Sequence, residues 1–339
     1  MRSSPSVAAW RDGWQRVLNA PAIAAGVFAM TFMLALPLAL VVRGAIAAHL
    51  RDSLMAVRAA DGANWDWWQE FSAQATGLGT TFTPSVIGVA TTFDSVSSVF
   101  DGRVPIAPLA WALALYLAGW LFVSGGIIDR YARQRPTRTY GFFAACGTFF
   151  FRFLRLGALV GVVYWGLFTY VHPWLFGQVY ETLTRDLSVE RTAFAWRVAL
   201  YAAFGLLVLF VNVLTDYAKA RIVIEDRRSA VGALAAAWRF IRHHPGRVVG
   251  LYGLNTLTFI ALVGVWALIA PGTGGGVTMW IGFAMTQLFV VTRLLIKLQF
   301  LASETALFQA ALAHASYTAA PEPLWPDSAA AEAIARTTM

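Results

Sequence analysis

Charged residues are scarce in this chain. Asp, Glu, Lys and Arg together make up 13% of its 339 residues, whereas apolar residues make up 58%. The mean hydropathy is +0.60. A water-soluble domain keeps most of its polar residues outside and cannot hide so large an apolar fraction in its core. The shortage of charge therefore excludes an ordinary soluble protein and indicates that much of the surface faces lipid.

The residue patterns of common catalytic and metal sites are also missing. Cys146 is the single cysteine, so the chain forms no internal disulfide and offers no cysteine cluster to a metal. The five His residues are scattered, and no two face each other as metal or haem ligands at membrane depth: His49, His172, His243, His244 and His314. Nucleophile-elbow, zinc-protease and paired-carboxylate signatures are absent. The glycine run 272–276 lacks the Lys that follows in a phosphate-binding loop, and we interpret it as a turn. We therefore expect a protein that is not an enzyme and binds neither cofactor nor metal.

Five long runs contain no charged residue at all. They lie between Arg16 and Arg43, Arg103 and Asp129, Arg155 and Glu181, Arg197 and Asp216, and Arg247 and Arg293, and they hold 26, 25, 25, 18 and 45 residues. A helix needs about 20 apolar residues to cross a bilayer, so the first four runs provide one span each. The last run is broken by the glycine turn and provides two. The sequence thus predicts an all-α integral membrane protein with six transmembrane helices near residues 21–46, 106–128, 154–178, 196–218, 248–270 and 277–300.

The distribution of basic residues predicts how these spans are oriented. Lys and Arg are enriched in cytoplasmic segments of membrane proteins. With the N-terminus inside, sixteen basic residues fall on the cytoplasmic side and five on the outer side. We therefore expect both termini in the cytoplasm. The net charge of +8 is explained by this topology, and we expect no nucleic-acid partner, because the basic residues border the spans.

The regions outside the spans divide the chain into three parts. Residues 1–20 are predicted to form an interfacial helix, with Trp10, Trp14 and Leu18 on one side and Arg11 and Arg16 on the other. Residues 21–317 form a single six-span membrane domain, whose outer segment is 48–105. Residues 318–339 are rich in Pro and Ala and are predicted to be a disordered cytoplasmic tail.

A short charged motif recurs where spans reach the cytoplasmic side. It is 129–133 in the first copy and 216–221 in the second, and Arg293 with Lys297 form a fainter third copy. Each copy leads into a further helix-like stretch, which we call an elbow helix: 140–155, 229–244 and 304–314. Pro245 and Gly246 end the second one. The repetition predicts hairpin-like units that share one charged cytoplasmic face.

The run 220–254 begins Ala-Arg-Ile-Val-Ile-Glu-Asp-Arg-Arg-Ser and continues through Trp238-Arg239-Phe240. It resembles the inner-face elbow of a group of bacterial six-span inner-membrane proteins of mostly unknown function. That group includes the membrane domain attached to some glycerophosphodiester phosphodiesterases. The resemblance covers about 35 residues and carries over no catalytic residue. It implies a multi-pass protein of the bacterial inner membrane.

Two functions remain open at this point. The first is a non-enzymatic membrane scaffold or partner subunit that binds lipid headgroups, anionic ones included, or another membrane protein or a second copy of itself. Its candidate contacts are the basic residues of the elbows: Arg133, Arg138, Lys219, Arg221, Arg239, Arg242 and Arg247. The alternative is a transporter or lipid-handling permease with a polar path between its spans. Its candidate residues are Asn212, Asn255, Thr258 and Gln287. The scarcity of charge inside the spans favours the first function.

Overall fold

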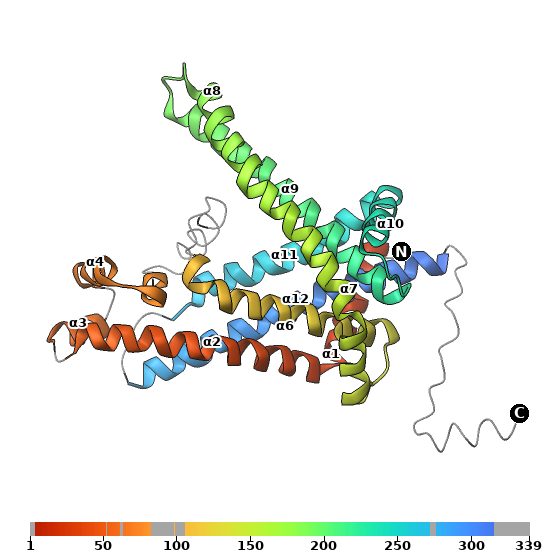
Figure 1. Ribbon diagram of the computed structural model, residues 1–339, viewed down its shortest axis with the longest axis horizontal. Helices are drawn as coiled ribbons and strands as arrows, with labels where there is room; N and C mark the ends of the chain where they lie inside the picture. The colour runs from red at the N-terminus through yellow and green to blue at the C-terminus, as the bar shows by residue number, and fades with distance from the viewer. Residues whose placement is uncertain are drawn as a thin grey trace, which may run out of the picture.

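The chain folds as a bundle of long helices (Figure 1). The structure is a computed structural model that describes residues 4–51, 53–61, 64–82, 98, 106–271 and 276–314. Six described helices are long and apolar enough to cross a membrane, which confirms the predicted number of spans. They are α2 (Pro21–Leu50), α6 (Ile106–Arg133), α7 (Thr139–Gly166) with its helical continuation to Thr184, α9 (Glu190–Ile224), α11 (Pro245–Ile269) and α12 (Val277–His314).

Shorter helices cap and connect these spans, and no strand occurs in the described residues. They are α1 (Pro5–Leu18), α3 (Met55–Asp61), α4 (Trp65–Gln74), η1 (Gly77–Thr81), η2 (Leu167–Val171), η3 (Trp174–Val179), α8 (Tyr180–Thr184) and α10 (Ala230–His243). The predicted tail 318–339, the glycine turn at 272–275 and most of the outer segment beyond residue 82 lie outside the described ranges.

One end of the bundle gathers most of the short helices and chain reversals. We call it the α10 end: it comprises α1, α10, the starts of α2, α7 and α11, and the ends of α6, α9 and α12 (Figure 1). Arg16 on α1 links the helices at this end: it donates to the Tyr131 carbonyl of α6 at 3.0 Å and to the Gln309 side chain of α12 at 2.7 Å. Successive spans therefore run in opposite directions: α2, α7 and α11 start at this end, and α6, α9 and α12 finish at it.

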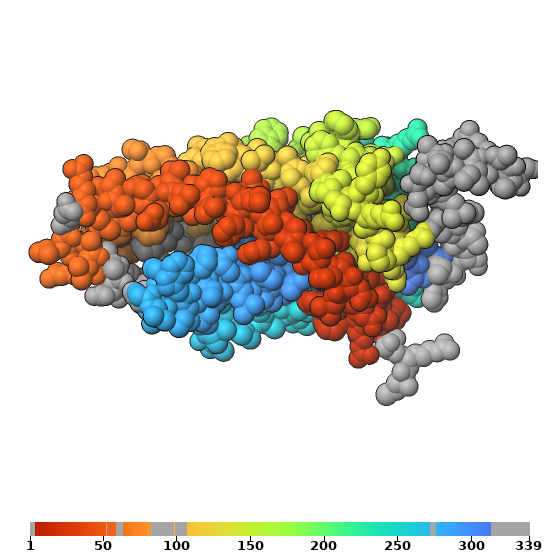
Figure 2. All heavy atoms as spheres, turned by 90° about the horizontal axis from the view of Figure 1, so that it is seen from below, coloured from red at the N-terminus to blue at the C-terminus, as the bar shows by residue number. Residues whose placement is uncertain are grey.

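Helix α1 packs tightly against α12 at this end. A side chain at Gly13 would approach Ser303 Cβ to 2.7 Å, so only glycine allows the contact. The face of α1 that is buried carries Ala9, Gly13, Arg16 and Val17. The prediction that groups Arg16 with Arg11 on one side of this helix is therefore wrong for burial, because Arg11 is exposed whereas the Arg16 guanidinium has its partners inside the bundle. In the space-filling view, α1 lies across the end of the molecule while α2 and α12 run side by side away from it (Figure 2).

Helices α7 and α9 form an arm that diverges from the other long helices (Figure 1). The arm has a small hydrophobic core of its own, built from Leu175, Leu200 and Phe204. The main core surrounds α12 near the α10 end and includes Tyr131, Tyr217, Phe153 and Phe308. Elsewhere the spans expose large apolar side chains. Such a surface is stable only in lipid, which agrees with a multi-pass membrane protein.

Only one of the three expected elbow helices is a separate helix. Residues 229–244 form α10, which is bounded by the Ser229 cap and by Pro245 at the start of α11. Residues 140–155 instead belong to α7, and residues 304–314 continue α12. No proline interrupts either of these stretches, so the helix runs on through them.

Candidate functional site at the α9–α10 turn

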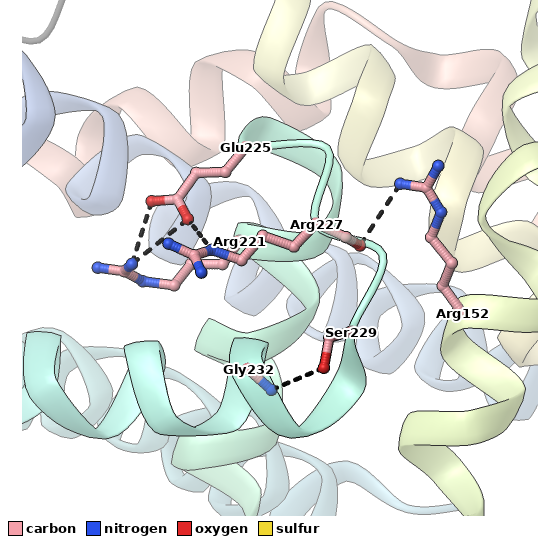
Figure 3. A network of polar contacts seen from close by, with 6 residues as sticks. All are labelled: Arg152, Arg221, Glu225, Arg227, Ser229 and Gly232. Atoms are coloured by element: carbon pink, nitrogen blue, oxygen red, sulfur yellow. Dashed lines mark hydrogen bonds and ion pairs between the residues drawn. The ribbon is translucent and has the colours of Figure 1, made fainter.

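The turn between α9 and α10 is built by a chain reversal at the end of α9. Asp226 takes a left-handed backbone conformation, with φ of 50°, which turns the chain away from the helix axis. Ser229 then caps α10, because its hydroxyl oxygen accepts a hydrogen bond from the Gly232 N–H at 3.1 Å (Figure 3). The turn thus ends one helix and starts the next within five residues, 225–229.

Ion pairs hold the turn in this shape. Glu225 accepts hydrogen bonds from Arg221 at 3.1 and 3.4 Å and from Arg227 (Figure 3). The Arg221 guanidinium also lies 4.8 Å from the centre of the Phe308 ring on α12. These contacts occupy two of the basic side chains of the turn, and they leave those residues little freedom to bind anything else.

Arg152 ties the turn to α7. It donates to the Asp226 carboxylate at 2.5 Å. It also donates to the Arg227 carbonyl at 3.4 Å, reaching across from the neighbouring helix (Figure 3). The middle of α7 and the turn that precedes α10 are therefore held beside each other.

A groove of about 630 Å³ lies between these two helices. Its walls are one face of α7 and the first residues of α10 with the preceding turn. The lining residues are Arg155, Ala158, Leu159, Val162, Arg228, Ser229, Ala230 and Val231. Arg155 and Arg228 are exposed, and neither forms an ion pair with another described residue. The groove therefore combines an apolar wall with two arginines whose charge is not neutralised by the described chain.

Helix α10 itself has three kinds of surface. The face toward the bundle is buried and consists of small residues and one ring: Ala230, Ala233, Ala236, Ala237 and Phe240. Val231 and Trp238 are apolar but exposed. Arg239 and Arg242 are exposed as well, and Arg242 follows Trp238 by four residues, on the same side of the helix. A helix with adjoining exposed apolar and basic surfaces is typical of one that lies at a membrane interface.

The seven predicted basic contacts fall into two groups. Three are held by acidic partners within the chain: Arg133 by Asp129 at 2.9 Å, Lys219 by Asp216 at 2.8 Å, and Arg221 by Glu225 at 3.1 Å. Arg138, Arg239 and Arg242 are exposed and form no ion pair with other described residues, and Arg247 is half-buried. All seven lie at the α10 end, but only the second group is open to an external partner.

The four predicted polar-path residues are distributed over α9, α11 and α12. Asn212 accepts a hydrogen bond from Tyr164 at 2.9 Å between α9 and α7. Asn255 is fully buried and donates to the Ser303 hydroxyl at 2.8 Å between α11 and α12. Thr258 donates to a carbonyl of its own helix, and Gln287 is half-buried. The two asparagines serve different helix pairs, as interhelical hydrogen bonds do.

A buried charged cluster that the sequence analysis did not single out lies beside these asparagines. Glu304 on α12 is 2% exposed, and neither of its carboxylate oxygens has a hydrogen-bond partner among the described residues. Asp216 and Lys219 are the charged groups that act on it, and Lys219 donates to Asp216. Lys219 is thus paired with the half-buried Asp216, whereas the buried Glu304 carboxylate nearby has no ion-pair partner among the described residues. Three or more His, Cys, Asp or Glu side chains do not gather into a metal-binding group anywhere in the described part of the chain.

Arg155, Arg228 and Glu304 are the functional candidates that sequence reasoning missed. Arg155 and Arg228 each stand next to an apolar stretch, as many arginines of this chain do, so their positions in the sequence do not distinguish them. Only the folded structure shows that they line the same groove. Glu304 carried a signal, since it is a carboxylate within a long apolar helix. Comparison of the chain with protein-family models, curated proteins and solved structures finds no match, so the function rests on the chemistry of its own residues.

Proposed function

We propose that this chain is a non-enzymatic integral membrane scaffold or partner subunit whose α10 end binds anionic lipid headgroups. The observation that supports this proposal is the exposed part of α10, where the apolar Val231 and Trp238 adjoin the basic Arg239 and Arg242. Indole rings favour the headgroup layer, and each basic residue near an anionic membrane surface contributes about 1 kcal/mol. The helix therefore suits the boundary between lipid and water.

The distribution of basic residues indicates which side of the membrane the α10 end faces. Most of the basic residues of the chain are at the α10 end, whereas the turn at the far end of the arm carries Arg185 and Arg191. Under the positive-inside rule the α10 end faces the cytoplasm of a bacterial inner membrane. In this arrangement α10 acts as the elbow through which lipid, a membrane protein or a second copy docks.

Retention of lipid by the purified protein tests the proposal. Arg239→Glu with Arg242→Glu is expected to reduce the anionic lipid that co-purifies with the protein, measured by mass spectrometry of the extracted lipid. Arg185→Glu with Arg191→Glu, at the opposite end, is the matched control and is expected to leave it unchanged. Equal retention by both double variants and the unmodified chain would rule out α10 as the binding helix.

The buried cluster favours a second candidate, a transporter or permease. Glu304 and the amide oxygen of Asn255 are buried polar groups without hydrogen-bond partners in the described structure, and such groups inside a membrane mark transport paths in many proteins. If Asn255→Leu abolishes a transport phenotype while lipid retention is unchanged, this candidate replaces the first.

A further inference from the structure

The geometry points to a specific occupant for the groove between α7 and α10: one anionic phospholipid, with its phosphate between Arg155 and Arg228 and an acyl chain along Leu159 and Val162. This inference rests on the proposed function, because it names the lipid class and the place where a single molecule is held. It differs from general attraction at the α10 surface, since the groove residues are separate from Arg239 and Arg242.

The order of residues along α7 matches the order of groups in a phospholipid. Arg155, Leu159 and Val162 are four and three residues apart, so they share one face of the helix. Val162 lies about 10 Å farther along the helix than Arg155, in the direction away from the α10 end. The charged group is therefore at the end of the bundle, and the apolar groups are deeper, as the head and tail of a lipid in that leaflet are.

The two arginines of the groove have donors to spare. Arg155 makes one hydrogen bond, to the Phe151 carbonyl of its own helix at 3.2 Å. Its neighbour Arg152 is held by Asp226 instead, and Arg227 by Glu225. Arginine presents a planar fork of N–H donors that matches the oxygens of a phosphate group, and such charge-assisted bonds are stronger than neutral ones. A phosphate between Arg155 and Arg228 would neutralise two like charges that the described chain leaves facing one groove.

Ser229 adds a polar group at the same level. Its hydroxyl oxygen accepts from the Gly232 N–H, which leaves the hydroxyl proton free to be donated. The side chain is exposed and belongs to the groove lining. It can therefore donate to a phosphate oxygen next to Arg228.

The apolar wall lacks a cover from the described chain. Val162 is 66% exposed and Val231 is 64% exposed, and they come from the two opposite walls. The volume of about 630 Å³ is that of a ligand site. Basic pockets between membrane helices at the cytoplasmic side commonly hold anionic lipid headgroups. The groove joins this kind of pocket to an apolar strip suited to an acyl chain.

Native mass spectrometry of the full chain in detergent, titrated with phosphatidylglycerol, tests the inference. We expect one tightly bound lipid on the unmodified chain. Arg155→Gln with Arg228→Gln is expected to weaken that site at least about tenfold, because two charge-assisted contacts are lost. Val162→Trp, which fills the groove and leaves both arginines in place, is expected to weaken it too. Arg155→Lys with Arg228→Lys keeps the charge and is expected to restore part of the affinity. The unfolding temperature of each variant shows that it is folded.

The controls separate this inference from the proposed function. Arg239→Gln with Arg242→Gln is expected to lower weaker, additional lipid binding and to leave the tight site intact. If only that pair lowers binding, the groove is not the lipid site while the proposed function stands; if neither pair changes binding, both fail. Equal binding of phosphatidylcholine would overturn the role of the two arginines. Complete competition by glycerol phosphate would overturn the acyl-chain contact and leave a phosphate site only.

Discussion

Arg152 on α7 and Asp226 in the α9–α10 turn are joined by a hydrogen-bonded ion pair of 2.5 Å, although they are 74 residues apart in the chain. The Arg152 side chain is 14% exposed and the Asp226 side chain is 69% exposed. Pairs with one side in water contribute little to stability. The main effect of this contact is therefore on position, since it holds the two walls of the groove next to each other.

This relationship gives the first prediction. In a double-mutant cycle with Arg152→Ala and Asp226→Ala, the coupling free energy of unfolding is expected to be about 0.2–1 kcal/mol. The affinity for phosphatidylglycerol is expected to fall although the free energy of unfolding changes little, because the groove widens when the pair is lost. A coupling above about 2 kcal/mol, measured by chemical unfolding in detergent, would show that the pair is a main stabilising contact instead.

The second prediction concerns Glu304. Its carboxylate is buried without a hydrogen-bond partner in the described structure, which costs free energy of folding. Glu304→Gln keeps the shape and removes the charge, and we expect it to increase the free energy of unfolding by about 1–3 kcal/mol. The exposed Glu190 at the start of α9 is the control, and Glu190→Gln is expected to lower stability slightly, because an acidic residue there favours the helix. A lower unfolding temperature for Glu304→Gln would show that attraction to Lys219 outweighs the cost of burying the Glu304 charge.

The third prediction concerns the packing of α1. Gly13→Ala places a methyl group 2.7 Å from Ser303 Cβ and 2.9 Å from Ser303 Cα, so the helices must move apart. Overpacking of this kind costs about 1–3 kcal/mol. Gly26 in α2 has no neighbouring atom within 4 Å of such a methyl group, so Gly26→Ala is the matched control. Gly26→Ala is expected to be neutral or stabilising by up to about 1 kcal/mol. Similar unfolding temperatures for both variants would contradict the close contact.

The fourth prediction tests orientation. Cys146 is the single cysteine of the chain and is fully buried, so the unmodified protein is expected to react slowly with thiol reagents. Asp186 lies between α8 and α9, and Arg242 lies on α10; both are exposed. In intact cells, a membrane-impermeant maleimide is expected to label Asp186→Cys and to label Arg242→Cys only after permeabilisation. The reverse pattern would place the α10 end outside.

The structure agrees with the sequence-based predictions for those features that depend on a local property of the chain. Five predicted spans each correspond to one long helix, the third continues from α7 through η2 and η3, and α10 ends where Pro245 begins α11. The elbows at 140–155 and 304–314 were predicted as separate helices by analogy with the second copy, but they continue into α7 and α12. The analogy failed because only the second copy is followed by Pro and Gly. Similar composition was not enough to end a helix.

The candidate site depended on contacts between distant segments. Of the predicted basic residues, Arg221 and Arg239 look alike in sequence, yet Arg221 is held by Glu225 and a ring of α12, while Arg239 is exposed. Which arginine remains open to a ligand depends on whether folding brings a carboxylate to it. No local pattern carries that information.

The sequence by itself determined that this chain has six segments long and apolar enough to cross a membrane, because the transfer of a segment into lipid depends on its own length and apolar character. It also determined where α10 begins and ends, through the residues of its cap and of its proline. Only the tertiary structure decided that Arg155 and Arg228 line the same groove, that Arg16 is buried, and that Glu304 lies near Lys219 and Asp216. These are juxtapositions of side chains from different helices, and their chemistry exists only once the helices have packed.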